Sequence, residues 1–173
     1  MAERSAKPKV GILMGSDSDL NVMREAEKRL DAFGIPYETR IMSAHRTPDI
    51  AAQYAATAEQ RGLEVIIAGA GAAAHLAGAI AANTTLPVIG IPIDSSSLKG
   101  LDALLATVQM PAGIPVATMA IGKAGAANAG IFAAQIVARR DAAVGAKLKE
   151  FKKEMAAGVQ ERDRTLQSEK HNG

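Results

Sequence analysis

The sequence predicts a three-layer α/β/α sandwich, in which a five-stranded parallel sheet in flavodoxin-like order carries helices on both faces. Two observations lead to this fold. Short runs rich in β-branched residues alternate with longer alanine-rich segments along most of the chain, which is the pattern of a parallel α/β protein. No segment rich in proline, glycine or serine divides the 173 residues, and no repeat is visible, so we expect a single domain over residues 1–173.

Five segments are expected to form the strands. The first is Val-Gly-Ile-Leu-Met at residues 10–14, an unbroken apolar run that is typical of a strand buried on both faces. The other four are expected at residues 37–42, 65–68, 87–91 and 116–120.

Helices are expected in the segments that follow the strands. The first begins at Leu20, continues with apolar residues at helical spacing and ends near Gly34. The second begins at Pro48, a residue type favoured in the first helical turn, with Thr47 as its N-cap, and it ends near Arg61. Three more helices are expected at residues 74–83, 101–108 and 124–140.

A helical tail is expected over about residues 142–170, beyond a core at about residues 8–141. Its apolar stripe consists of Val144, Leu148, Phe151 and Met155. Because the tail lies outside the alternation of strands and helices, we expect it to pack on a neighbouring subunit. The alternative is a peripheral helix that covers the chain's own sheet.

The composition excludes several classes of protein. Cysteine is absent, which excludes a disulfide framework, a Cys-ligated metal and a thiol nucleophile. No apolar run approaches the roughly 18 residues of a membrane span. The first five residues lack the apolar core of a signal peptide, so we expect a cytoplasmic protein with no membrane partner.

The charge and the sizes of the residues indicate which partners to expect. The net charge is +2, and the lysines of the tail alternate with glutamates, so we expect no nucleic-acid partner. The three Phe and two Tyr offer few platforms on which bases or a flavin could stack. The many alanines and 16 glycines build only a modest core in one subunit, which favours a homo-oligomer.

Three loops are candidates for a binding site, because ligands of open parallel sheets bind beyond the carboxyl ends of the strands. They lie at residues 15–19, 43–47 and 69–75. The first has the sequence Gly-Ser-Asp-Ser-Asp at the start of a helix, where backbone N–H groups and the hydroxyls of Ser16 and Ser18 suit a phosphate. Simple helix capping is the alternative interpretation of these residues.

Two histidines lie in these loops, and histidine is the side chain that exchanges protons near neutral pH. His45 is followed by Arg46, whose guanidinium can bind a phosphate through two hydrogen bonds. His75 either belongs to the same site or makes a structural hydrogen bond in its turn.

Residues 69–74 satisfy the pattern G-x-G-x-x-A between a strand and a helix, and Asp94 ends the next strand. This pattern is a weak signal of nicotinamide binding, because it follows the third strand instead of the first. A nicotinamide-linked oxidoreductase is therefore a remote alternative, as is a nucleotide-binding protein without catalytic activity.

The loops resemble the signature segments of the class I 5-(carboxyamino)imidazole ribonucleotide mutases, enzymes of bacterial purine (IMP) biosynthesis. The resemblance is carried by Gly-Ser-Asp-Ser-Asp at 15–19, Ser-Ala-His-Arg-Thr-Pro at 43–48, Ala-Gly-Ala-Gly-Ala-Ala-Ala-His-Leu at 68–76, and Gln-Met-Pro-Ala-Gly-Ile-Pro-Val at 109–116. A further block lies at residues 120–129, and the resemblance covers about residues 10–140.

The resemblance implies an isomerase that moves a carboxylate from the exocyclic 5-amino nitrogen to C4 of aminoimidazole ribonucleotide through trapped CO2. It implies no ATP, metal or organic cofactor, and a homo-octamer. It makes His45 the general acid and base. The implied substrate-binding residues are Ser16, Ser18, Asp19, Ser43, Ala44, Arg46, Ala70, Gly71, His75 and Leu76.

Within this resemblance, Ser16, Ser18, Ser43 and Arg46 would hold the 5'-phosphate, and Asp19 the ribose hydroxyls. The main alternative is a carboxylase that uses CO2 directly. Such relatives tend to have Lys-Gly-Pro after the histidine, whereas this chain has Arg46-Thr47-Pro48, which favours the mutase.

Overall fold

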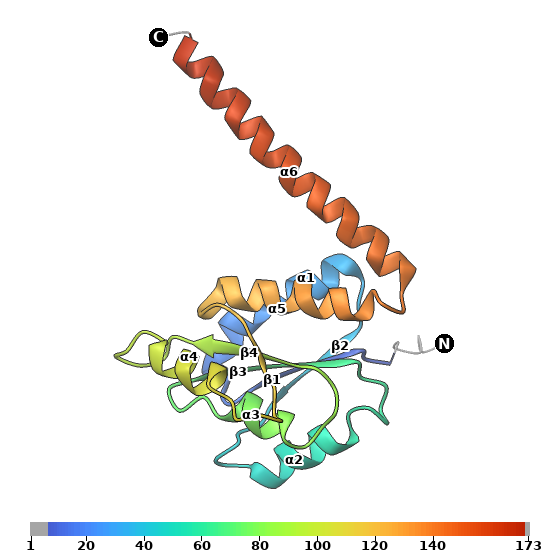
Figure 1. Ribbon diagram of the computed structural model, residues 1–173, viewed down its shortest axis with the longest axis vertical. Helices are drawn as coiled ribbons and strands as arrows, with labels where there is room; N and C mark the ends of the chain where they lie inside the picture. Colours follow the sequence, from blue (N-terminus) through green and yellow to red (C-terminus); the bar gives the residue numbers. More distant parts are fainter. Residues whose placement is uncertain (1–6, 172–173) are drawn as a thin grey trace.

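In the computed structural model, which describes residues 7–171, five parallel strands form one sheet in the order β2-β1-β3-β4-β5 (Figure 1). This order is the predicted flavodoxin-like one, and its direction of growth reverses at β1. The strands are β1 (Val10–Met14), β2 (Tyr37–Ile41), β3 (Val65–Gly71), β4 (Val88–Ile93) and β5 (Ala117–Thr118).

Helices cover both faces of the sheet, which confirms the predicted three layers (Figure 1). α1 (Leu20–Phe33), α5 (Gly122–Val137) and the start of α6 (Ala142–His171) lie on one face, and α2 (Pro48–Thr57), α3 (Leu76–Ala81) and α4 (Leu101–Val108) lie on the other. A short 3-10 helix, η1 (Asp17–Asp19), precedes α1.

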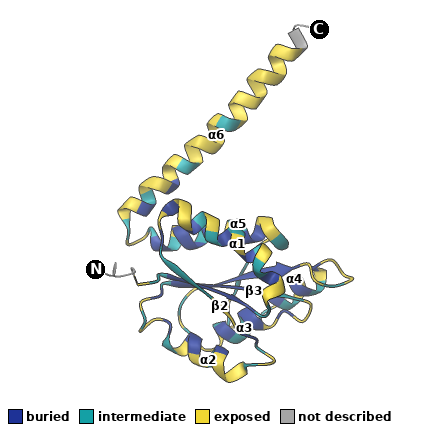
Figure 2. Ribbon diagram, turned by 180° about the vertical axis from the view of Figure 1, so that it is seen from behind, coloured by how far each residue is buried: buried dark blue, intermediate teal, exposed yellow. Residues whose placement is uncertain are grey.

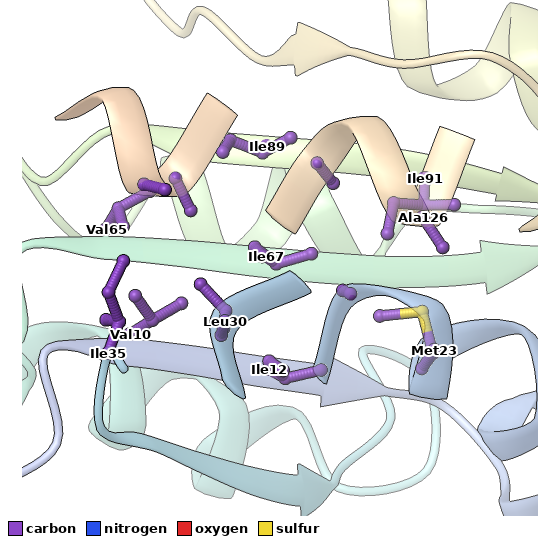
Figure 3. Close-up of a cluster of buried hydrophobic side chains, with 14 of the residues drawn as sticks. Val10, Ile12, Met23, Leu30, Ile35, Val65, Ile67, Ile89, Ile91 and Ala126 are labelled. Atoms are coloured by element: carbon purple, nitrogen blue, oxygen red, sulfur yellow. The ribbon is translucent and has the colours of Figure 1, made fainter. Parts of the chain in front are cut away.

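The buried strands divide their side chains between two hydrophobic clusters. Val10, Ile12 and Met14 of β1 face α1 and α5, whereas Leu13 faces α2 and α3, as the alternation of side chains along a strand requires. Figure 3 shows the larger cluster, in which Met23 and Leu30 of α1 and Ala126 of α5 lie over the isoleucines and valines of β1, β3 and β4.

Several element boundaries differ from the prediction. β3 continues to Gly71 instead of ending at residue 68, because its last residues pair with β4 up to Gly71–Ile93. α3 is correspondingly shorter than the predicted 74–83, and β5 has only two residues. α2 ends at Thr57, and the chain then passes through turns to Gly62, whose φ of 98° ends the segment as the sequence indicates.

The tail forms α6, whose two ends have different surroundings. Val144 and Leu148 are buried in the larger cluster, and Phe151 packs edge-to-face on Phe33 of α1 at 5.6 Å between ring centroids. Beyond this point the helix leaves the body of the chain, and almost all of it is exposed (Figure 2). Met155, which the sequence places on the same stripe, is 48% exposed.

Candidate active site

The loops after β1, β2 and β3 meet at the carboxyl edge of the sheet and line a cavity of about 390 Å³. All predicted site residues except His75 line this cavity, and His75 contacts it through His45. The lining residues that the sequence predicted are Ser16, Ser18, Asp19, Ser43, Ala44, His45, Arg46, Ala70, Gly71 and Leu76.

The first loop combines a helix cap with a buried acid. Ser16 caps η1 by accepting a hydrogen bond from the backbone N–H of Ser18 at 3.3 Å, so the capping interpretation holds for this serine. Asp19 precedes α1 but makes no capping hydrogen bond with its side chain, and it is only 7% exposed. Its carboxylate is therefore available for a role other than capping.

Burial raises the pKa of Asp19 above its ordinary value, and the nearby charge of Asp17 acts in the same direction. The hydroxyl of Ser18, which donates to Asp19 Oδ1 at 3.3 Å, and the positive charge of Arg46 oppose this increase. Holding a carboxylate in this position costs folding free energy, which is a common feature of binding sites.

The second loop is organised around Ser43, which is buried. Its hydroxyl accepts hydrogen bonds from the backbone N–H groups of His45 (3.3 Å) and Arg46 (3.1 Å). Thr47 is the N-cap residue of α2, as predicted, but its side chain makes no capping hydrogen bond, and its hydroxyl instead accepts from the backbone N–H of Ser43 at 2.9 Å. Thr47 thus stabilises the loop that carries His45.

Arg46 connects the second loop to the first. Its Nη2 donates to the carbonyl oxygen of Gly15 at 2.6 Å, and the side chain is otherwise exposed. The guanidinium therefore lies beside the acidic first loop and supplies the positive charge that this loop lacks.

The two histidines contact each other across the end of the sheet. His45 Nε2 and His75 Nδ1 are 2.7 Å apart, and the rings pack edge-to-face with centroids 4.9 Å apart. At this distance one nitrogen donates and the other accepts, so at most one of these two atoms carries a proton. Both rings are exposed in the single chain.

The third loop does not have the geometry of a dinucleotide-binding turn. Gly69 and Gly71 belong to β3 instead of to a turn, and α3 begins only at Leu76. A Cβ on Gly69 would overlap the sulfur of Met23, so this glycine allows close packing of α1 on the sheet and not the approach of a pyrophosphate. These contacts remove the structural basis of the nicotinamide alternative.

Three lining residues were missed by the sequence analysis, namely Gly15, Ala73 and Ser95. Gly15 and Ala73 lie within loops that the sequence had identified. Ser95 follows β4, which runs to Ile93, two residues beyond the predicted strand end, so it lies outside the three candidate loops. The run of serines at residues 95–97 was the available signal.

None of the helices within residues 7–171 has the length and apolar character needed to cross a membrane.

Comparison with known proteins points to one family. Residues 9–158 match the family model described as AIR carboxylase. The chain is 57% identical over 151 residues to the N5-carboxyaminoimidazole ribonucleotide mutase of Vibrio parahaemolyticus. This alignment covers 87% of this chain and 94% of the relative. It is 56% identical over 164 residues to the protein of the same name from Pyrococcus horikoshii. This alignment covers 95% of this chain and 92% of the relative.

A solved structure gives the same result for the fold. The crystal structure of PurE from Treponema denticola superposes with a TM-score of 0.81 at 30% sequence identity and covers 92% of this chain and 98% of that one.

Proposed function

This chain belongs to the AIR carboxylase family, and from that membership we propose that it is an N5-carboxyaminoimidazole ribonucleotide mutase of purine biosynthesis. The observation that carries the proposal is identity above 55% to curated mutases over most of the chain. Its substrate is a ribonucleotide, and the cavity at the carboxyl edge of the sheet is where we propose that it binds.

The substrate's 5'-phosphate is proposed to lie between the first and second loops. Arg46 there offers the guanidinium that a phosphate prefers, already oriented by its bond to the Gly15 carbonyl. Ser16 and Ser18, which belong to the loop that Arg46 contacts, also line the cavity. Ser43 also lines the cavity, and its hydroxyl, which accepts two backbone hydrogen bonds, can still donate its own proton to a phosphate oxygen.

The ribose is proposed to lie against Asp19. A carboxylate accepts hydrogen bonds from sugar hydroxyls, and it would repel a phosphate. Because no capping hydrogen bond occupies the Asp19 side chain, its oxygens can accept from such hydroxyls.

The imidazole of His45 is proposed to carry the proton in both halves of the reaction. In the first half, the imidazolium gives a proton to the 5-amino nitrogen as the bond from this nitrogen to the carboxylate breaks, and CO2 leaves. In the second half, C4 attacks the carbon of CO2, and the neutral imidazole then takes the proton from C4. The ring ends the cycle protonated, as it began.

His75 is proposed to support this exchange. Its Nδ1 lies within hydrogen-bond distance of the His45 nitrogen that faces it, so it orients the His45 ring and shares its proton. Ala70, Gly71 and Leu76 line the cavity with an apolar wall, against which the base and CO2 would lie. Because the proton and CO2 both come from the site and the substrate, the proposed route requires no metal, ATP or organic cofactor.

The chain is proposed to act as a cytoplasmic homo-octamer. A neighbouring subunit would limit the access of water to His45, which is exposed in one chain. Exposed apolar side chains on α4 and on the outer part of α6 are suited to such contacts. They are Leu101, Leu105, Val108, Met155, Val159 and Leu166.

The test compares two substrates. With 5-(carboxyamino)imidazole ribonucleotide and no ATP, the protein should form the C4-carboxylated isomer at a rate that added bicarbonate does not change. If carboxylation instead requires aminoimidazole ribonucleotide with raised bicarbonate, the chain is the direct carboxylase. If neither reaction occurs but nucleotides bind, the chain is a binding protein.

A further inference from the structure

Ser95 lies in the cavity at the end away from the proposed phosphate site. Because β3 and β4 are neighbours in the sheet and β1 lies on the other side of β3, the loop after β4 borders the third loop and not the first. Ser95 lines the cavity together with Ala70, Gly71 and Leu76. It therefore lies at the end that the base and its carboxylate would occupy.

The hydroxyl of Ser95 is free, whereas that of its neighbour is not. Within residues 7–171, the Ser95 side chain has no hydrogen-bond partner. Ser96, by contrast, donates to Asp102 Oδ2 at 2.7 Å and accepts from the backbone N–H of Leu98 at 3.2 Å. Ser96 thus anchors the loop to the start of α4. Ser95 lies in this anchored loop, and its O–H group is not donated to any residue within residues 7–171.

The absence of a side chain at Gly71 leaves room for Ser95. A Cβ on Gly71 would overlap the Ser95 hydroxyl and approach Cβ of Ser95 to 2.7 Å. The missing side chain at Gly71 therefore allows the loop after β4 to lie directly on the end of β3. This packing, together with the anchor at Ser96, places Ser95 beside the apolar lining residues Ala70, Gly71 and Leu76.

We propose that Ser95 is a further substrate-binding residue, whose hydroxyl donates a hydrogen bond to the carboxylate carried by both substrate and product. This inference rests on the proposed mutase function, in which both the substrate and the product carry a carboxylate. A donor there would hold the carboxylated nucleotides and would have nothing to bind in aminoimidazole ribonucleotide.

The experiment measures the affinities of two nucleotides by calorimetry, together with mutase kinetics. Ser95→Ala should weaken the binding of C4-carboxylated aminoimidazole ribonucleotide by about tenfold, as expected for a lost hydrogen bond to a charged group. Its affinity for aminoimidazole ribonucleotide should change by less than about twofold, because that ligand lacks the carboxylate. Ser95→Thr, which retains a hydroxyl, should restore the affinity for the carboxylated nucleotide.

The matched control is Ser97→Ala, in the same loop, since Ser97 is exposed like Ser95 but does not line the cavity. It should leave both affinities unchanged. If Ser95→Ala binds both nucleotides as the unaltered protein does, or loses affinity for both equally, the role of Ser95 is wrong while the mutase function stands. If the unaltered protein has no mutase activity, the proposed function itself fails, and this inference fails with it.

Discussion

His45 Nε2 and His75 Nδ1, which are 2.7 Å apart, join the ends of two strands that are not neighbours in the sheet. His45 follows β2 and His75 follows β3, and β1 lies between them. The contact therefore spans the point at which the strand order reverses, where open parallel sheets bind their ligands. It brings the proposed proton carrier beside the third loop, which is proposed to hold the base.

Arg46→Ala should weaken nucleotide binding. The guanidinium is proposed to bind the phosphate, and the loss of charge-assisted hydrogen bonds costs about 1.5–3 kcal/mol. Calorimetry with the product nucleotide measures this change. Arg24→Ala, an exposed arginine on α1 outside the cavity, is the control and should bind normally. Equal affinities for the two variants would remove Arg46 from the phosphate site.

Asp19→Asn should stabilise the fold at neutral pH. Burial raises the pKa of Asp19 in the folded protein above its value in the unfolded chain, so the stability associated with this group is present at low pH and is lost as the pH rises through the raised pKa. The variant avoids this loss and should gain about 0.5–2 kcal/mol at pH 7, the size typical of single stabilising substitutions. Urea unfolding at pH 3 and pH 7 measures the difference, which should be present only at pH 7. A variant that is no more stable than the unaltered protein at pH 7 would contradict this account of Asp19.

Tyr54→Phe should destabilise the opposite end of the sheet. Tyr54 donates to Glu38 Oε1 at 2.8 Å, and Arg61 also binds this carboxylate. Burial alone would raise the pKa of Glu38, but the hydrogen bonds from Arg61 and Tyr54 lower it overall. Removing the Tyr54 hydroxyl should cost about 1–2 kcal/mol of unfolding free energy.

The pH dependence separates this effect from a packing defect. Stability that depends on an ionised Glu38 is present above its unfolded pKa and is lost as the pH falls through the lowered value. The cost of Tyr54→Phe, measured by urea unfolding, should therefore shrink below roughly pH 4. Tyr37→Phe, which removes a longer and more exposed hydrogen bond to Asp31 at 3.3 Å, is the control and should cost less. A cost that stays the same from pH 3 to pH 7 would mean that Glu38 is not involved.

Truncation after residue 152 should reduce the size of the oligomer. The truncated chain keeps Val144, Leu148 and Phe151, which pack on its own core, and loses Met155, Val159 and Leu166, which are 48%, 59% and 49% exposed. Thermal unfolding should show that the core still folds, and light scattering should show a smaller assembly. An unchanged assembly would mean that the outer part of α6 has no role between subunits.

Much of the fold could be predicted because local patterns and tertiary packing agree. Gly34 ends α1 in the left-handed conformation, with a φ of 71°, as the glycine after an apolar helical stripe predicts. The end of β3 could not be predicted, because the extended conformation of Gly69 and Gly71 depends on pairing with β4. Nor could the sequence predict that the Thr47 hydroxyl accepts a hydrogen bond from the backbone N–H of Ser43 and does not cap α2.

The position of the candidate site could be predicted from the sequence, but its internal contacts could not. The strand-end loops were identified from the general position of ligands in parallel sheets, and the individual roles came from the resemblance to a family. What the sequence could not provide were contacts between loops. The distance between His45 and His75 and the fit of Ser95 over Gly71 depend on how strands separated in the sequence are placed beside each other.

The most direct test of the account is the activity of His45→Asn, measured together with its affinity for the product nucleotide. Asparagine can occupy the position of the ring but cannot carry the proton, so turnover should fall by about 100-fold or more. Calorimetry should show a nucleotide affinity close to that of the unaltered protein, since the phosphate and ribose contacts remain. A variant that turns over substrate at nearly the normal rate would show that His45 is not the proton carrier.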